Sequence, residues 1–286
     1  MRFHVYDHEK SFGADVLDML LEHEAQNNLL IDYIRNERGL DSSKWLMASV
    51  KDDGGDVLLA ALYAPPFPIV LYERGNCPTD AAVERLSHEL KAMNHDFPGV
   101  FAQQALAHRF ASAYAGEGNY RSTALNHVMR LDQLAKIPEV LGRFRAIEVG
   151  DLHFLPYWNR AMEADCGMPP CDILEESRRL ASLIGKDTHF IWENANGQPV
   201  AQAAHGRSTQ SGASIKHVYT PPHFRNNGYA TAVVAALSGA LLMRGYRFCC
   251  LFADAENPAS CDIYHKVGYI NQCIFEELVW ERGDIL

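Results

Sequence analysis

The 286-residue sequence predicts a mixed α/β (α+β) fold, in which a sheet is flanked by helices. Apolar runs of strand length alternate with segments whose apolar residues recur at helical spacing. The order strand, helix, helix, three strands, helix, strand, helix, strand occurs twice along the chain. We therefore expect a structural duplication into two halves of ordinary domain size, residues 1–142 and 143–286.

The elements of the first half follow from short apolar runs and from helical periodicity, with Thr79 as the expected cap of one helix. Strands are expected at residues 2–6, 45–51, 57–63, 69–73, 100–101 and 124–131. Helices are expected at residues 14–24, 29–35, 80–93 and 103–113.

Stronger local signals mark the second half. Asp172 can cap a helix, Asn196-Gly197 is a typical hairpin turn, and Gly245 stands where a helix C-terminal cap is wanted. Pro221-Pro222 ends a strand because proline cannot donate to the ladder. Strands are expected at residues 144–149, 189–194, 199–207, 214–220, 248–253 and 271–280. Helices are expected at residues 155–164, 172–184, 229–244 and 259–266.

Composition excludes several classes of function. The net charge is −10, and the two halves carry −7 and −3, so nucleic acid is not an expected partner. The polar N-terminus and the short or proline-containing apolar stretches predict neither a signal peptide nor a membrane segment. Seven cysteines without a Cys-x-x-Cys pair indicate reduced thiols, and we expect a cytoplasmic protein. The 13 histidines show no metal-ligand spacing, so no metal is expected.

The most informative segment is Val218–Ala230, which reads as a strand, a tight loop and the start of a helix. Unpaired backbone N–H groups and the positive helix end would converge there and bind an anion without a metal. Gly228 allows close approach of a ligand, and the small Ala230 lets the helix pack nearby. The segment lacks the Gly-Lys-Ser/Thr of a phosphate-binding Walker loop and the three spaced glycines of a dinucleotide site.

Residues 225–230, Arg-Asn-Asn-Gly-Tyr-Ala, resemble the Arg/Gln-x-x-Gly-x-Gly/Ala loop of the GCN5-related N-acetyltransferases (GNAT), which holds the pyrophosphate of acetyl-CoA. A second element at 257–269, Asn-Pro-Ala-Ser-Cys-Asp-Ile-Tyr-His-Lys-Val-Gly-Tyr, resembles the segment that ends the same site. The match covers residues 187–275. It implies a GNAT-like mixed sheet and two tandem GNAT-like halves, of which 143–286 is catalytic.

This resemblance assigns roles to the matching residues. The backbone of 218–220 would pair with pantetheine, and the loop amides would bind pyrophosphate. Tyr264 would donate a proton to the departing CoA thiolate, whose pKa is about 8.5, while a backbone N–H would hold the oxyanion. The expected cofactor-binding residues are Val218, Tyr219, Thr220, Arg225, Asn226, Asn227, Gly228, Tyr229, Ala230, Thr231, Asn257 and Ser260.

Other readings of these residues stay open. Asn257 can equally cap the helix before Pro258, and the backbone of Arg225 can matter more than its side chain. Three strand residues compete for the role of general base: Glu193, His217 and His189. The first half lacks the Arg-x-x-Gly-x-Ala spacing at its matching place, 73–79, and no Asn…Tyr segment follows, so we expect a degenerate half without acetyl-CoA.

The resulting expectation is an acetyl-CoA-dependent N-acetyltransferase. It would transfer an acetyl group to a primary amine of a small molecule or peptide by direct attack in a ternary complex. The acceptor is not identified by the sequence, and the resemblance is compatible with a homodimer. The alternative is a non-catalytic protein that binds or senses acyl-CoA, and a third reading is transfer to a hydroxyl or of a longer acyl group.

Overall fold

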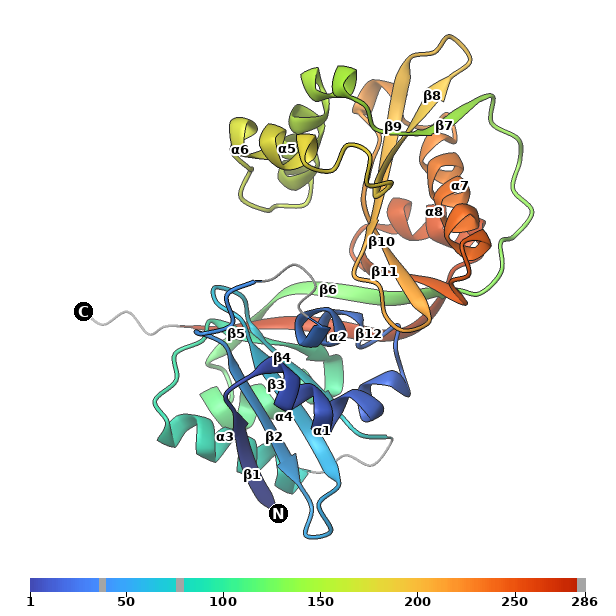
Figure 1. Cartoon of the computed structure of the whole chain (residues 1–286). Helices are drawn as coiled ribbons and strands as arrows, with labels where there is room; N and C mark the ends of the chain where they lie inside the picture. Colours follow the sequence, from blue (N-terminus) through green and yellow to red (C-terminus); the bar gives the residue numbers. More distant parts are fainter. Residues whose placement is uncertain (36–39, 76–79, 282–286) are drawn as a thin grey trace. The chain divides into compact units, whose positions relative to one another are not determined.

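The computed structural model describes residues 1–35, 40–75 and 80–281 (Figure 1). Thr79, the expected cap, lies outside the described residues. The chain divides into two compact units, each built from separate stretches of sequence. The first unit contains Met1–Met129, Phe252–Pro258 and Asn271–Leu286. The second unit contains Arg130–Leu251 and Ala259–Ile270.

The first unit holds a mixed sheet with strand order β1-β2-β3-β4-β5-β12-β6. Its strands are β1 (Arg2–Tyr6), β2 (Leu46–Lys51), β3 (Val57–Tyr63), β4 (Ile69–Glu73), β5 (Gly99–Gln103), β6 (Tyr120–Leu131) and β12 (Ile270–Trp280). Its helices are α1 (Glu9–Leu21), α2 (Asn28–Arg35), α3 (Asp80–Ala92) and α4 (Gln104–Ala115).

The second unit holds the strand order β11-β10-β9-β8-β7. Its strands are β7 (Gly142–Ala146), β8 (His189–Asn194), β9 (Pro199–Gly206), β10 (Gly212–Tyr219) and β11 (Phe248–Asp254), whose last three residues belong to the first unit. Its helices are α5 (Leu155–Asp165), α6 (Ile173–Ala181), α7 (Tyr229–Met243) and α8 (Pro258–Val267), with short 3₁₀ turns at Val149–His153 and Pro222–Phe224. Helix α7 packs against β8, β9 and β10, while α5 packs against α6 and β10.

The repeated element order and the mixed α/β class expected from the sequence are confirmed. The local signals hold as well. Asp172 caps α6 by accepting the N–H groups of Leu174 and Glu175, both at 2.9 Å. Gly197 and Gly245 take φ values of +75° and +101°, which suit a hairpin turn and a helix end.

Helix α1 begins at Glu9, five residues before its expected start at Ala14. The reason is that the buried helical stripe already starts at Phe12 and continues at Val16 and Met19. Gly13 interrupts the propensity signal, but a side chain there would overlap Ile34 of α2. The glycine therefore serves the packing of two helices, which local propensity does not reveal.

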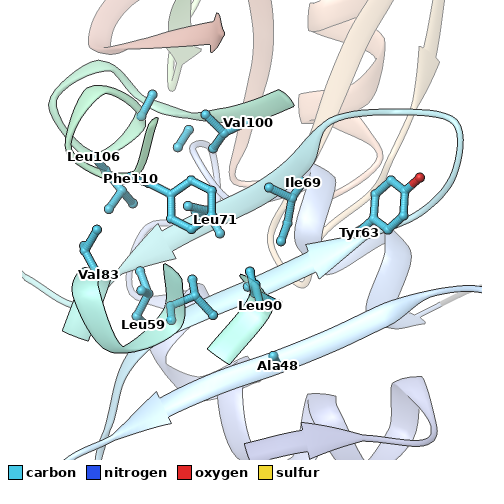
Figure 2. Packing of buried hydrophobic residues seen from close by; sticks show 14 of the residues in the cluster. Ala48, Leu59, Tyr63, Ile69, Leu71, Val83, Leu90, Val100, Leu106 and Phe110 are labelled. Carbon is cyan, nitrogen blue, oxygen red and sulfur yellow. The ribbon is translucent and has the colours of Figure 1, made fainter. Parts of the chain in front are cut away.

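The core of the first unit consists of one sheet covered on both faces. Alternate residues of β2 and β3 face opposite sides, as the pleat requires. On one face, Ala48 and Leu59 pack against α3 and α4 (Figure 2). On the other face, Met47 and Ala60 pack against α1 and α2. The labelled residues of the first cluster are Ala48, Leu59, Tyr63, Ile69, Leu71, Val83, Leu90, Val100, Leu106 and Phe110.

The last strand of the chain belongs to the first unit. β12 runs antiparallel to β5, with Phe275 opposite Gln103 and Val279 opposite Gly99. Leu278 of β12 is fully buried in the same cluster as Val100. The first unit thus takes strands from both halves of the sequence. This pairing depends on tertiary packing, because the sequence of an apolar strand does not specify which strand it will pair with.

In the described part of the chain, no helix has the length and apolar character needed to cross a lipid bilayer.

We predict that Gly99→Ala destabilises the first unit by about 1–3 kcal/mol, the usual cost of overpacking. A Cβ at Gly99 would overlap the backbone carbonyl oxygen of Leu278, and backbone cannot rotate away. Urea unfolding followed by circular dichroism measures the change. Gly150→Ala is the control, because a Cβ there meets only the Glu148 carboxylate at 3.9 Å. Equal midpoints for Gly99→Ala and the wild type would show that β12 does not need this close approach.

Candidate functional site

Strand β10 pairs with β9 along one edge over most of its length, but with β11 along the other edge over a short stretch. It runs parallel to β11 over Gly212–Ser214 only, with Ser214 opposite Cys250. Val218 and Tyr219, at the other end of β10, lie beyond these paired residues. The backbone of this end is therefore in a position to accept an extended ligand as an added strand. Thr220 follows directly, and its Oγ1 atom is buried without a hydrogen-bond partner in the described structure.

A β-bulge in β10 marks the start of this segment. Toward β9, Lys216 lies opposite Ala204 and Tyr219 lies opposite Gln202, so His217 and Val218 together oppose one residue. His217 adopts φ +51°, a conformation that is uncommon for residues other than glycine. Bulges twist a strand and redirect a side chain, and they recur beside active sites.

The loop after β10 uses its own side chains to hold its shape. Arg225 donates from Nε to the Thr220 carbonyl at 3.0 Å and from Nη2 to Asp165 of α5 at 2.6 Å. Asn227 donates from Nδ2 to the carbonyls of Phe224 at 3.1 Å and Arg225 at 3.0 Å. Both side chains are thus bound within the protein, which leaves the loop backbone and the exposed Asn226 to contact a ligand.

The first turn of α7 forms an anion-binding geometry. Gly228 precedes the helix with φ +78° and provides no side-chain cap. The first intrahelical bond at this end runs from the Ala232 N–H to the Gly228 carbonyl. The N–H groups of Tyr229, Ala230 and Thr231 therefore precede the helical ladder, and the helix dipole adds positive potential there. Residues 225–228 are exposed, so a ligand can reach them.

Helix α8 carries the other predicted residues. Asn257 directly precedes it and donates its backbone N–H to Asp254, while Ser260 lies in its first turn. Tyr264 follows one turn later, half-buried, and burial raises the pKa of its phenol well above the ordinary value. The buried Tyr269 hydroxyl shares a 2.8 Å hydrogen bond with Ser238 of α7 and so fixes the end of α8 against α7.

Of the three candidate bases, Glu193 is already paired. Its carboxylate accepts from Arg145 Nε at 2.6 Å and from Arg143 Nε at 3.0 Å. Burial works to raise the pKa of Glu193, but the two guanidinium groups outweigh it and lower the pKa below the ordinary value. A carboxylate held by two cations is a poor proton acceptor.

The two histidines lie together. Their ring centroids are 6.0 Å apart, and both Nδ1 atoms are buried without a hydrogen-bond partner in the described structure. Burial lowers the pKa of His189 to about 4 and that of His217 to about 3. Lys216, Arg179 and, for His217, Arg207 and the neighbouring ring act in the same direction. Both rings are neutral at pH 7.

A buried chain of polar side chains leads away from His189, and the sequence analysis missed it. Gln202 of β9 contacts the His189 ring and donates to Asn159 of α5 at 2.6 Å. Asn159 in turn donates to the carboxylate of Glu176 on α6, which also binds Arg179. These residues lie on separate elements and share no motif. Their only sequence signal is polar character at positions where the helical and strand patterns place the core.

The corresponding place in the first unit is built differently. β4 runs parallel to β5, as β10 does to β11, but pairs with β3 in regular register from Leu62↔Val70 to Leu59↔Glu73. Arg109 binds both Glu73, at the end of β4, and Asp80, in the first turn of α3. The carboxylates occupy the region where a phosphate would need positive potential. Residues 76–79 lie outside the described residues.

Within residues 1–35, 40–75 and 80–281, no group of three or more His, Cys, Asp or Glu side chains is arranged to hold a metal ion. The cysteines in this part of the chain are free thiols. Cys249 and Cys250 are fully buried in β11, and burial raises the pKa of Cys249 to about 12. They therefore pack as small apolar side chains and are not suited to act as nucleophiles.

Comparison with known proteins supports the sequence resemblance. Residues 196–280 match the family model described as FR47-like protein, which is related to the GNAT proteins. No curated protein matches the chain.

Solved structures share the fold along nearly the whole chain. A GNAT-family acetyltransferase from Colwellia psychrerythraea has 10% identity and a TM-score of 0.61, covering 99% of this chain and 100% of its own. A GCN5-related N-acetyltransferase from Sphaerobacter thermophilus has 18% identity and a TM-score of 0.65, covering 99% and 97%. A tandem GNAT protein from the clavulanic acid biosynthesis pathway has 11% identity and a TM-score of 0.56, covering 99% and 100%. The GNAT-like two-half fold expected from the sequence is confirmed.

We predict that His189 makes the protein less stable as the pH falls. Its folded pKa is about 4, below the ordinary value of about 6.5, so the unfolded chain binds more protons between these values. Stability is therefore fully present above pH 6.5 and declines as the pH falls toward 4. His189→Phe should remove about 2–3 kcal/mol of the loss between pH 7 and 4.5. Urea unfolding at both pH values measures it; identical pH dependence in variant and wild type would contradict a buried neutral ring.

Proposed function

We propose that this chain, a GNAT-fold protein whose residues 196–280 match the FR47-like family, is an acyltransferase that moves the acetyl group of acetyl-CoA to a primary amine. Catalysis is assigned to the half 143–286. The acceptor would be a small molecule or a peptide. One observation carries the proposal. The pairing of β10 with β11 ends at Ser214, β10 then has a bulge, and the chain continues into the start of α7, where the backbone N–H groups have no side-chain cap.

The residues present fit the donor. Acetyl-CoA is an extended chain with amides at one end and a pyrophosphate at the other. Val218, Tyr219 and Thr220 would pair with the pantetheine amides, and the buried, unpartnered Thr220 Oγ1 is a further polar atom beside them. The amides of residues 225–231 would bind the pyrophosphate. Asn257 and Ser260, beside the start of α8, would contact the pantetheine and phosphate portion.

The Arg225 side chain has a supporting part in this proposal. Its two hydrogen bonds join the Thr220 carbonyl to Asp165, so it fixes the strand end and the loop relative to α5. The ligand would then meet the loop backbone in a preformed shape, which reduces the entropy cost of binding.

Tyr264 would act on the leaving group. The amine nitrogen attacks the thioester carbon, the carbon–sulfur bond breaks, and the sulfur leaves with the bonding electrons. Since burial raises the pKa of Tyr264, its hydroxyl stays protonated and donates a hydrogen bond to the sulfur as negative charge develops. The conjugate acid of the CoA thiolate has a pKa of about 8.5, below that of the Tyr264 hydroxyl, so the thiolate does not remove the tyrosine proton completely. The proton that the amine loses passes to solvent, and solvent returns a proton to the CoA thiolate, so that free CoA leaves as the thiol.

The first unit would serve a different purpose. Its regular β4 lacks a bulge, and Glu73 and Asp80 bring negative charge to the start of α3. We assign no acetyl-CoA to this half, which fits the expectation of a degenerate GNAT-like domain. The alternative function for the whole chain is a non-catalytic acyl-CoA sensor, which would use the same loop but not Tyr264.

Gly228→Ala should weaken acetyl-CoA binding at least about tenfold, or about 1.4 kcal/mol. An alanine at φ +78° is strained, and its Cβ would meet Val140 at 3.2 Å, so the loop must move. Gly245→Ala is the matched control, since it has φ +101° at the other end of α7 with nothing within 4 Å. Calorimetric titration measures both. Wild-type affinity in Gly228→Ala, or no binding by the folded wild-type chain, would refute the assigned cofactor loop.

Tyr264→Phe distinguishes the enzyme from the sensor. We expect kcat for acetyl transfer to a panel of primary amines to fall about 10- to 100-fold, the rate equivalent of a hydrogen bond to a charged group. Acetyl-CoA affinity should not change, because the hydroxyl matters only once the sulfur is charged. Tyr269→Phe is the control, as its hydroxyl binds Ser238. A protein that binds acetyl-CoA but turns over no amine would favour the sensor.

A further inference from the structure

The order of ligand groups along β10 locates the reacting end of the site. The proposed function places pyrophosphate at residues 225–231 and pantetheine at residues 220–218, so the chain of the donor runs back along the strand. The next residue in that direction is His217, at the bulge. The thioester would therefore lie beside a half-buried imidazole that the bulge has redirected.

His189 cannot reach a substrate itself, since only 1% of its surface is exposed. It lies opposite Ala204, which lies opposite Lys216, so these residues form one row across β8, β9 and β10. The ring of His217 enters the same face, 6.0 Å from that of His189 between centroids. The two imidazoles are direct neighbours, and one of them is closed off from solvent.

The polar chain behind His189 fixes which of its nitrogens carries the hydrogen. Glu176 only accepts, because Arg179 holds it ionised with bonds of 2.7 and 2.5 Å. Asn159 must therefore donate to Glu176, Gln202 must donate to Asn159, and the remaining Gln202 oxygen must accept from His189 Nε2 at 3.2 Å. The Nδ1 atom of His189 is left as a buried lone pair without a partner in the described structure.

We propose that His217 is the catalytic residue that accepts the proton from the acceptor amine, and that His189, oriented by Gln202, Asn159 and Glu176, is a positioning residue whose ring lies beside that of His217. This inference rests on the proposed function. When the amine nitrogen bonds to the thioester carbon, one N–H bond breaks and its proton moves to the His217 ring. The proton then passes to solvent, and His217 returns to its neutral form. A positive charge on one ring disfavours a charge on the other.

Burial, and after it the charges around the pair, explain why both rings stay neutral until the reaction. The groups that face His217 are His189 on β8, Lys216 on its own strand, Arg179 on α6 and Arg207 after β9. All of them oppose a second positive charge, while Glu176 favours the charged form of His189. The His217 imidazole is neutral at pH 7, so its lone pair is available. Because its pKa is low, it is a weak base that takes the proton only as bond formation makes the amine nitrogen acidic, and it then loses the proton at once.

Histidine-selective NMR of the full chain tests the pairing without any substrate. We expect the wild-type spectrum to show both rings neutral at pH 6, with His189 carrying its hydrogen on Nε2. His189→Gln keeps a donor for Gln202 but removes the neighbouring ring, so the pKa of His217 should rise, while burial still holds it below its ordinary value of about 6.5. His205→Gln is the control: its ring binds the Asp187 carbonyl, and it points to the opposite face of β9 from Gln202. An unchanged pKa of His217 in His189→Gln, or a hydrogen on His189 Nδ1, would overturn the pairing.

Kinetics with acetyl-CoA and a panel of primary amines tests the roles. His217→Gln should lower kcat about 100-fold or more with unchanged acetyl-CoA affinity. His189→Gln should lower kcat about tenfold and move the acid limb of the pH profile upward with the pKa of His217. Wild-type turnover in folded His217→Gln would refute this inference and leave the acetyltransferase proposal standing. Absence of acetyl-CoA binding in the wild type would refute the proposed function, while the NMR result would still decide the pairing.

Discussion

The bulge in β10 is the constraint on which the candidate site depends. Two residues, His217 and Val218, oppose one residue of β9, and this shift in register redirects the end of β10 and the loop after it. The parallel pairing with β11 has already ended at Ser214, so the strand leads outward into the loop and the α7 helix start. Without the bulge, His217 would follow the ordinary alternation of the strand and its φ of +51° would have no cause.

The two halves show how one topology supports two different local chemistries. Each has two parallel strands connected by a helix. In the second half, β10 carries a bulge and leads to an uncapped helix start, whereas β4 of the first half pairs with β3 in regular register. In the second half, the Arg225 and Asn227 side chains bind carbonyl groups of the loop itself. They do not cap the first N–H groups of α7, which are left for a ligand. In the first, Glu73 and Asp80 bring carboxylates, bound by Arg109, to the equivalent place. The fold alone does not decide which half binds an anion.

Local sequence signals predicted the elements and the loop because each acts within a few residues. Asp172 caps a helix, Gly228 precedes one in the left-handed conformation, and both facts follow from neighbouring atoms. The pairing of β12 with β5 and the chain from His189 to Glu176 depend on distant packing. Sequence periodicity identifies a buried face, but it does not say which strand or which polar side chain will meet it. The roles assigned to Tyr264 and the cofactor-binding residues stay predictions.

Hydrogen exchange with mass spectrometry, with and without acetyl-CoA, can show directly whether the backbone of β10 and of the loop before α7 binds the cofactor. It reads the backbone N–H groups themselves, which are the proposed ligand contacts, and it compares both halves in one experiment. We expect slower exchange at residues 218–220 and 225–231, with little change at the end of β4 and the start of α3. Protection confined to the first half, or no protection in the loop before α7, would contradict this expectation.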